Sequence, residues 1–89
     1  MPEEFRLSQN YPNPFNPATV IEFTMLKSGP ISLIVYDLLG REVKVLVNGT
    51  MDAGTYKATF DARDLTGGTY FYTLKSGDAS ITKKMALVK

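Results

Sequence analysis

The sequence contains no cysteine, no histidine and no tryptophan. Without cysteine there is no disulfide and no thiolate metal site, so the fold must be held together by its hydrophobic core alone. Without histidine, the Ser-His-Asp and Cys-His arrangements of nucleophilic catalysis are excluded, and zinc and copper lose their usual ligands. These absences disfavour an enzyme.

An excess of one charge sign is also missing, because ten Lys and Arg residues face nine Asp and Glu residues for a net charge of +1. This balance disfavours nucleic acid as a partner. No apolar run approaches the roughly 20 residues that cross a bilayer, so we expect no transmembrane segment. Residues 1–4 are polar and acidic and do not resemble a signal peptide, although this is uninformative if Met1 is not the native start. The 89 residues are enough for one domain with one core.

Proline and asparagine, by contrast, are concentrated in residues 9–17, which we call the proline–asparagine segment. It holds three prolines, three asparagines and two aromatic residues. Each proline fixes its own φ near about −65° and pushes the preceding residue toward extended backbone, so no helix forms here. We expect a rigid corner in which Tyr11 and Phe15 act as anchors and one or both rings are buried. A solvated linker and a polyproline ligand are the alternatives.

The rest of the chain alternates apolar and polar residues between turn signals, the pattern of half-buried strands. Strands are predicted at residues 5–7, 19–25, 31–36, 43–47, 56–60, 69–75 and 81–88, separated by turns at 27–30, 37–41, 48–49, 52–54, 61–68 and 76–78. No stretch has the apolar spacing of an amphipathic helix. The predicted fold is therefore all-β, an immunoglobulin-like β-sandwich of about seven antiparallel strands without a disulfide.

Several side chains have predicted places in this sandwich. Both faces of residues 31–36 are apolar, which indicates a central strand that is covered on both sides or flanked by a loop. Asp37 and Gly40 suit a tight turn, because aspartate bonds the amides ahead of it and glycine accepts positive φ. We expect Leu65 to insert into the core from its loop. Tyr70 and Tyr72 are also predicted to be core residues, with a sugar-binding surface as the alternative.

The charged residues suggest few sites. Asp37, Asp52, Asp61 and Asp64 lie in loops, where capping of turns is the favoured interpretation and an all-oxygen calcium site is an alternative. A carboxylate pair for glycoside hydrolysis is disfavoured, because so small a sandwich rarely forms a deep cleft. The C-terminal end is basic. Its lysines suit either an edge strand protected against aggregation or a positively charged recognition tail.

Five segments in order resemble the C-terminal sorting domains (type A) of the type IX secretion system of Bacteroidetes and relatives: residues 7–17, 33–43, 52–56, 65–72 and 82–89. The motif residues in these segments are Asn10, Tyr11, Pro12, Asn13, Pro14, Phe15, Asn16, Pro17, Tyr36, Asp37, Gly40, Arg41, Gly54, Gly68 and Tyr70. Two departures are mild: Met25-Leu26-Lys27 stands where Leu-Pro is usual, and Tyr56 stands where His is common. The resemblance also implies kinship with an immunoglobulin-like domain of the flagellar hook-capping protein.

The resemblance implies a single non-catalytic domain, residues 1–89, that is a fragment of a larger exported protein. Together with the absence of histidine and cysteine, the resemblance leads us to expect that the chain is not an enzyme and has no catalytic residues, no metal and no cofactor. The implied partners are the outer-membrane secretion machinery and, after cleavage of the tail, cell-surface lipopolysaccharide. The implied location is the cell surface or the exterior, reached through the periplasm, and we expect a monomer.

We expect recognition to lie in the last strand and C-terminus, where an exposed edge can pair with a partner's sheet and lysines can steer the encounter. The candidate recognition residues are Lys83, Lys84, Met85, Ala86, Leu87, Val88 and Lys89. Two alternatives remain open. A carbohydrate-binding or attachment module of a secreted glycosidase predicts an exposed aromatic row and affinity for polysaccharide, and a structural spacer predicts neither export nor binding.

Overall fold

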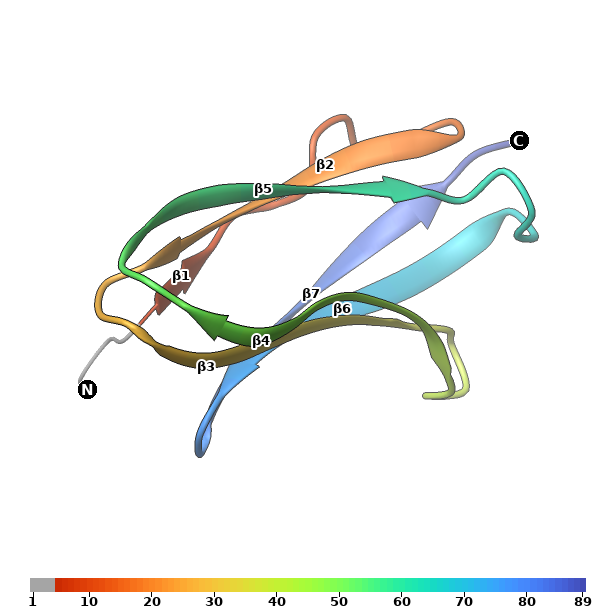
Figure 1. Ribbon diagram of the computed structural model, residues 1–89. Coiled ribbons are helices and arrows are strands. Elements are labelled where there is room, and N and C mark those ends of the chain that lie inside the picture. The colour runs from red at the N-terminus through yellow and green to blue at the C-terminus, as the bar shows by residue number, and fades with distance from the viewer. Residues whose placement is uncertain (1–4) are drawn as a thin grey trace.

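Two β-sheets pack face to face in the computed structural model, which describes residues 5–89 (Figure 1). One sheet has the strand order β1-β2-β5 and the other β4-β3-β6-β7, and every paired strand is antiparallel to its neighbour. The strands are β1 (Phe5–Leu7), β2 (Ala18–Met25), β3 (Gly29–Tyr36), β4 (Glu42–Met51), β5 (Gly54–Asp61), β6 (Gly68–Ser76) and β7 (Ala79–Leu87). The predicted seven-stranded all-β sandwich is confirmed. The polar start at residues 1–4 lies outside the described part of the chain.

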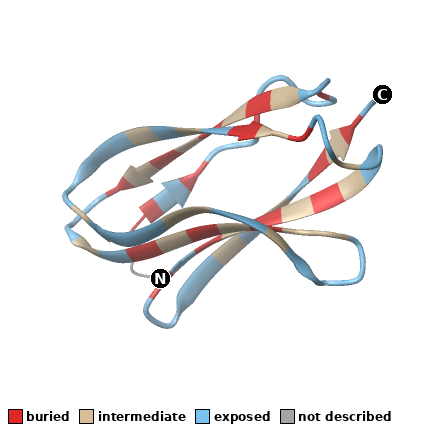
Figure 2. Cartoon of the chain, turned by 45° about the vertical axis from the view of Figure 1, so that its right-hand side comes forward, coloured by how far each residue is buried: buried red, intermediate tan, exposed pale blue. Residues whose placement is uncertain are grey.

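The core lies between the two sheets and follows the alternation of the sequence. In β2, Ile21, Phe23 and Met25 are buried, while the residues between them are half-exposed. β3 and β6 alternate in the same way, which Figure 2 shows as buried bands along both sheets. The predicted burial of Tyr70 and Tyr72 is confirmed. Each fully buried large apolar side chain contributes about 1.5–3 kcal/mol relative to an exposed one, so this interior is the main source of stability.

β3 is the predicted central strand, because it pairs with β4 on one side and with β6 on the other. The expectation that both faces of this strand are covered is wrong for its outer face. Ile34 and Tyr36 are half-exposed on the outer face of the four-stranded sheet. In a two-layer sandwich only the inner face of each sheet has a neighbouring layer, so apolar residues on the outer face remain partly in contact with water.

The prediction of a turn at Asn48-Gly49 is wrong. Both residues lie inside β4, opposite Ser32 and Ile31 of β3, and the chain turns only after Met51. Pairing with β3 outweighs the local turn preference of the dipeptide. The register between β3 and β4 also shifts at two points. Val45 is 43% exposed and does not share one face of the strand with Val43 and Val47.

The turn at residues 37–41 forms as predicted. The Asp37 Oδ1 atom accepts hydrogen bonds from the backbone N–H groups of Leu39 and Arg41, both at 2.9 Å. The Arg41 Nε atom donates to Asp37 Oδ2 at 2.7 Å, and Gly40 has a φ of 82°. Leu65, in the β5–β6 connection, packs against the core, which confirms its predicted insertion.

Candidate recognition site

The last strand, β7, is an edge strand whose neighbour in the sheet is β6. Its side chains alternate, and this alternation divides the candidate recognition residues. Met85 and Leu87 are 1% and 3% exposed and belong to the core. Lys84, Val88 and Lys89 are exposed, and Lys83 and Ala86 are half-exposed. Met85 and Leu87 therefore fix the position of the strand, and a partner of the folded domain would contact mainly the exposed residues.

Lys83 occupies a special position on this strand. It lies between Ile81 and Met85 on the face that turns toward the core, opposite Tyr72 of β6. A charged side chain that points inward from an edge strand discourages pairing with a second chain, because pairing would bury the charge. The protective role predicted for the C-terminal lysines therefore has a structural basis at this residue.

The proline–asparagine segment lies along the outer edge of β7. The Phe15 N–H donates to the Ala86 carbonyl at 2.9 Å, and the Val88 N–H donates to the Phe15 carbonyl at 2.9 Å, which makes a parallel bridge between Phe15 and Leu87. The Ala86 N–H donates to Asn13 Oδ1 at 3.0 Å. The Gln9 Nε2 atom donates to the Lys84 carbonyl at 2.7 Å. The expectation of an open edge is therefore wrong for the C-terminal part of β7, whose main-chain groups are already occupied.

Phe15 holds the segment in place, and Tyr11 does not anchor it with its ring. Phe15 is 2% exposed, and its ring centroid is 6.0 Å from that of Phe60. Tyr11 is 81% exposed, although its backbone makes two hydrogen bonds with Val20, at 2.9 and 3.0 Å. Alternation explains the difference, because the neighbouring Asn10 points inward and is 2% exposed. The three X–Pro peptide bonds of the segment are cis.

A buried polar network fixes the start of the segment. The Asn10 N–H donates to Tyr72 Oη at 2.8 Å, and Tyr72 Oη donates to the Ser8 carbonyl at 2.8 Å. The Asn10 Nδ2 atom donates to Thr19 Oγ1 at 3.1 Å and to the Pro12 carbonyl at 3.0 Å. Burial raises the pKa of the Tyr72 phenol, and the hydrogen bond from the Asn10 N–H opposes that rise. A tyrosine of the four-stranded sheet thus ties down a loop that begins in the other sheet.

The C-terminus lies beside the β5–β6 connection (Figure 1). The Lys89 Nζ atom donates to the Arg63 carbonyl, and a Cβ at Gly67 would lie 3.3 Å from the Leu87 carbonyl oxygen. Arg63 also forms an ion pair with Asp61, with 2.6 Å between Nη2 and Oδ2. The hydrogen bond from the Arg63 side chain lowers the pKa of the Asp61 carboxyl. The end of the chain is thus packed on a loop.

Other kinds of site have little support in the described part of the chain. Residues 5–89 contain no group of three or more His, Cys, Asp or Glu side chains arranged to hold a metal ion. The Asp37 and Asp61 carboxylates instead bond groups of their own turns. No helix within this range is long and apolar enough to cross a membrane. An open hollow of about 450 Å³ lies at the end of the sandwich near residues 30–32, 48–50 and 75–77.

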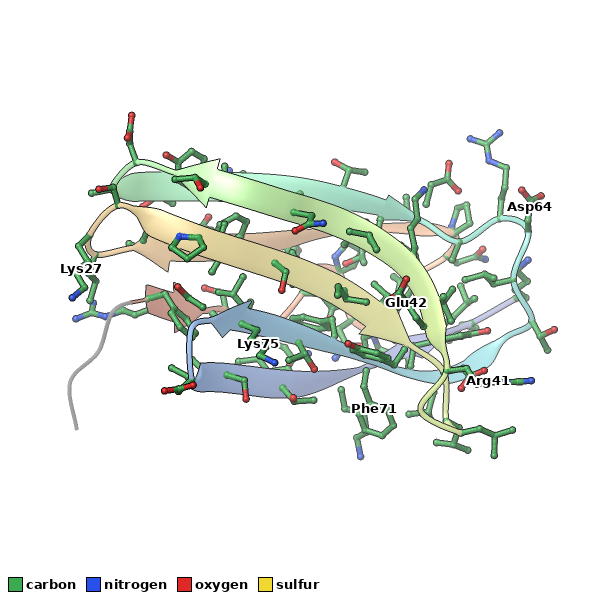
Figure 3. All side chains as sticks on the ribbon, turned by 60° about the horizontal axis from the view of Figure 1, so that its bottom comes forward. Lys27, Arg41, Glu42, Asp64, Phe71 and Lys75 are labelled. Carbon is green, nitrogen blue, oxygen red and sulfur yellow. The ribbon has the colours of Figure 1, made fainter. Side chains whose placement is uncertain are left out.

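The exposed aromatic row expected of a carbohydrate-binding module is short. Tyr36 and Phe71 are register partners on the outer face of the four-stranded sheet, and both are half-exposed. Figure 3 shows the Phe71 side chain directed away from the strands. Tyr11, the most exposed ring among residues 5–89, belongs to the proline–asparagine segment.

A family model described as the secretion system C-terminal sorting domain matches residues 9–88. A search of curated proteins found no match. The matched range runs from the start of the proline–asparagine segment, through strands β2 to β7, to Val88 beyond the end of β7. It therefore includes both the loop that covers the edge of β7 and that strand itself. The chain belongs to the family of C-terminal sorting domains of the type IX secretion system.

Proposed function

We propose that the secretion machinery recognises this sorting domain mainly through its last strand and C-terminus, residues 83–89. Membership of the family makes the domain a C-terminal sorting signal, implies interaction with the type IX machinery, and implies export to the cell surface or exterior. The family is non-catalytic, which agrees with a chain that lacks histidine and cysteine.

The observation that carries this proposal is the exposure of basic and apolar side chains where the edge strand meets the C-terminus. Lys84, Val88 and Lys89 are exposed there, while Met85 and Leu87 hold the strand in the core. Exposed lysines attract an acidic partner surface over a distance of about 10 Å at moderate salt and raise the rate of encounter. An apolar residue between them adds a desolvated contact once the partner has docked.

A reporter fusion tests the sorting function. Residues 1–89 are fused to the C-terminus of a periplasmic reporter and expressed in a host with a working type IX system. Export of the reporter to the surface or the medium is expected, and the control is the same reporter without the domain. Retention of the fusion in the periplasm would refute the sorting function for this chain and would favour the structural spacer.

Charge reversal tests the recognition residues without removing core residues. Deletion of residues 83–89 would also remove Met85 and Leu87, so loss of export would not separate recognition from folding. The variant Lys84→Glu changes one exposed side chain, for which stability effects usually stay within about 0.5 kcal/mol. We expect lower export at an unchanged Tm. Lys75→Glu, on an exposed lysine of β6 in the same sheet, is the matched control, and equal export from both variants would contradict the proposal.

The oligomeric state and the fate of the tail belong to the same proposal. We propose that the domain is monomeric, that the tail is cleaved after export, and that the cargo is then attached to lipopolysaccharide. Sedimentation of the purified domain measures the first point. Mass spectrometry of the exported reporter measures the other two, because cleavage removes a defined mass and attachment adds a heterogeneous one.

A further inference from the structure

We infer that the outer edge of β7 at Lys84–Val88 is a docking site for an extended strand of the secretion machinery, and that this strand enters by displacing the proline–asparagine segment. The inference rests on the proposed function, because it specifies how the last strand would be recognised. It differs from simple edge pairing, because the edge is covered in the folded domain and must first be vacated.

The bound segment shows what the site accepts. At Phe15 it runs parallel to β7 and makes the two main-chain hydrogen bonds of a parallel ladder, to the Ala86 carbonyl and from the Val88 N–H. The Phe15 side chain enters the core against Phe60. The preferred occupant is therefore an extended segment parallel to β7 with a large apolar residue at the position of Phe15.

The segment makes only part of the main-chain hydrogen bonds that a regular parallel strand would make with β7. In a regular parallel ladder, the residue two positions before Phe15 would accept from the Ala86 N–H and donate to the Lys84 carbonyl with its main chain. Here the Asn13 side chain accepts from Ala86, and the Gln9 side chain donates to Lys84. Main-chain groups of a regular strand would replace both side-chain bonds without fixing two flexible side chains.

The composition of the segment suits an occupant that blocks the edge and can leave. Each proline lacks an N–H donor, so a further strand cannot form a regular ladder on the outer side of the segment. Most of its residues are exposed, and Asn10 and Phe15 are the buried ones. Opening would therefore vacate few core positions, and an incoming apolar residue would refill the place of Phe15.

Amide hydrogen exchange of the purified domain tests whether the segment opens separately. The N–H groups of Ala86 and Val88 bond to the segment, whereas alternation directs those of Met85 and Leu87 toward β6. We expect Ala86 and Val88 to exchange at least about tenfold faster than Met85 and Leu87, because local opening requires less free energy than separation of β6 from β7. Equal rates for all four amides would overturn the inference.

A disulfide lock tests the displacement step during export. The chain has no cysteine, so Asn13→Cys/Ala86→Cys introduces one possible bridge, at a contact where the Asn13 side chain already reaches the Ala86 main chain. Oxidation is measured by mass, and the same double variant kept reduced by a thiol reductant is the matched control. We expect the reduced double variant to be exported at a higher rate than the oxidised one, because both carry the same substitutions and differ only in whether the segment can leave β7.

Each result decides the inference. Export of the oxidised double variant at the rate of its reduced form would overturn it. Dimers of Asn13→Ala that form through β7, together with loss of export, would assign the edge to a second copy of the chain and would also overturn it. Retention of the wild-type fusion would refute the proposed function instead, and the exchange rates would still show whether the segment opens.

Discussion

Replacing Phe15 with alanine is the most informative single change in this domain. The structure separates two aromatic residues that the sequence alone placed together as anchors of one loop. Phe15 is 2% exposed and lies against Phe60, while Tyr11 is 81% exposed. Phe15→Ala therefore removes a core side chain, and Tyr11→Ala removes a solvated one.

The expected magnitudes differ several-fold. A buried Phe→Ala change costs about 3–5 kcal/mol, because it combines lost burial with a cavity that relaxes only in part. For a domain of this length, 1 kcal/mol shifts the Tm by about 4–8 °C, so we expect Phe15→Ala to lower the Tm by about 12 °C or more. Tyr11→Ala should change the free energy of unfolding by less than about 0.5 kcal/mol, as for most exposed positions.

Urea unfolding followed by circular dichroism measures both free energies, and a thermal scan measures the Tm. The slope of free energy against urea must stay constant across the variants for the comparison to hold. A loss below about 1 kcal/mol for Phe15→Ala would refute the role of Phe15 as the core anchor of the segment. An equal loss for both variants would refute the distinction between the two rings.

Three further changes test other parts of the fold. Tyr72→Phe leaves the buried Asn10 N–H and the partly buried Ser8 carbonyl without their partner, so it should cost about 1–3 kcal/mol in urea unfolding. Burial raises the pKa of Tyr72 in the folded state. The contribution of Tyr72 to the free energy of unfolding is therefore complete below the ordinary tyrosine pKa of 10.0 and is lost as the pH rises through the folded pKa. The difference in free energy of unfolding between wild type and Tyr72→Phe should shrink in strongly alkaline buffer. Gly40→Ala should cost about 1 kcal/mol because its φ is 82°, whereas Gly49→Ala, which has open space around its Cβ position, should lower the Tm less. Hydrogen bonds from the Arg41 N–H and then from its side chain hold the pKa of Asp37 below 3.8. This turn should therefore keep its stability above pH 3.8 and lose it as the pH falls through the folded pKa. An NMR titration of the Asp37 carboxyl with a midpoint at or above 3.8 would contradict this.

Much of the fold could be predicted from the sequence, because a period-two pattern is a local property. The inner face of β2 is the alternation of Ile21, Phe23 and Met25 itself, and no distant contact is needed to recognise it. Local signals failed where pairing with another strand decided the outcome. Asn48-Gly49 favours a turn in isolation, but β3 extends beside it and holds it in a ladder. The register shifts of β4 likewise depend on its partner.

The candidate site could be predicted only in part. The last strand and its basic residues were predictable from the sequence. The alternation of side chains along a strand also separates core from surface residues, since Met85 and Leu87 share one face of β7. The covering of the edge could not be predicted, because the Asn13 side chain and the Ala86 N–H are 73 positions apart. No periodicity links residues at that separation, and the side-chain bonds that hold the segment leave no spacing signature.

The proline–asparagine segment and the strand proposed for recognition are in direct contact, so mutations in either one must be interpreted with the other in view. Removal of the C-terminal residues deletes core side chains and releases Phe15 from the Ala86 carbonyl and the Val88 N–H. Changes in the proline–asparagine segment uncover the edge of β7 without altering a residue of β7. Loss of export after either change therefore fits both a lost signal and a lost fold. Charge reversal at Lys84 separates the two explanations, because this exposed side chain lies outside the core and the bonds from the segment to β7 involve main-chain atoms of the strand.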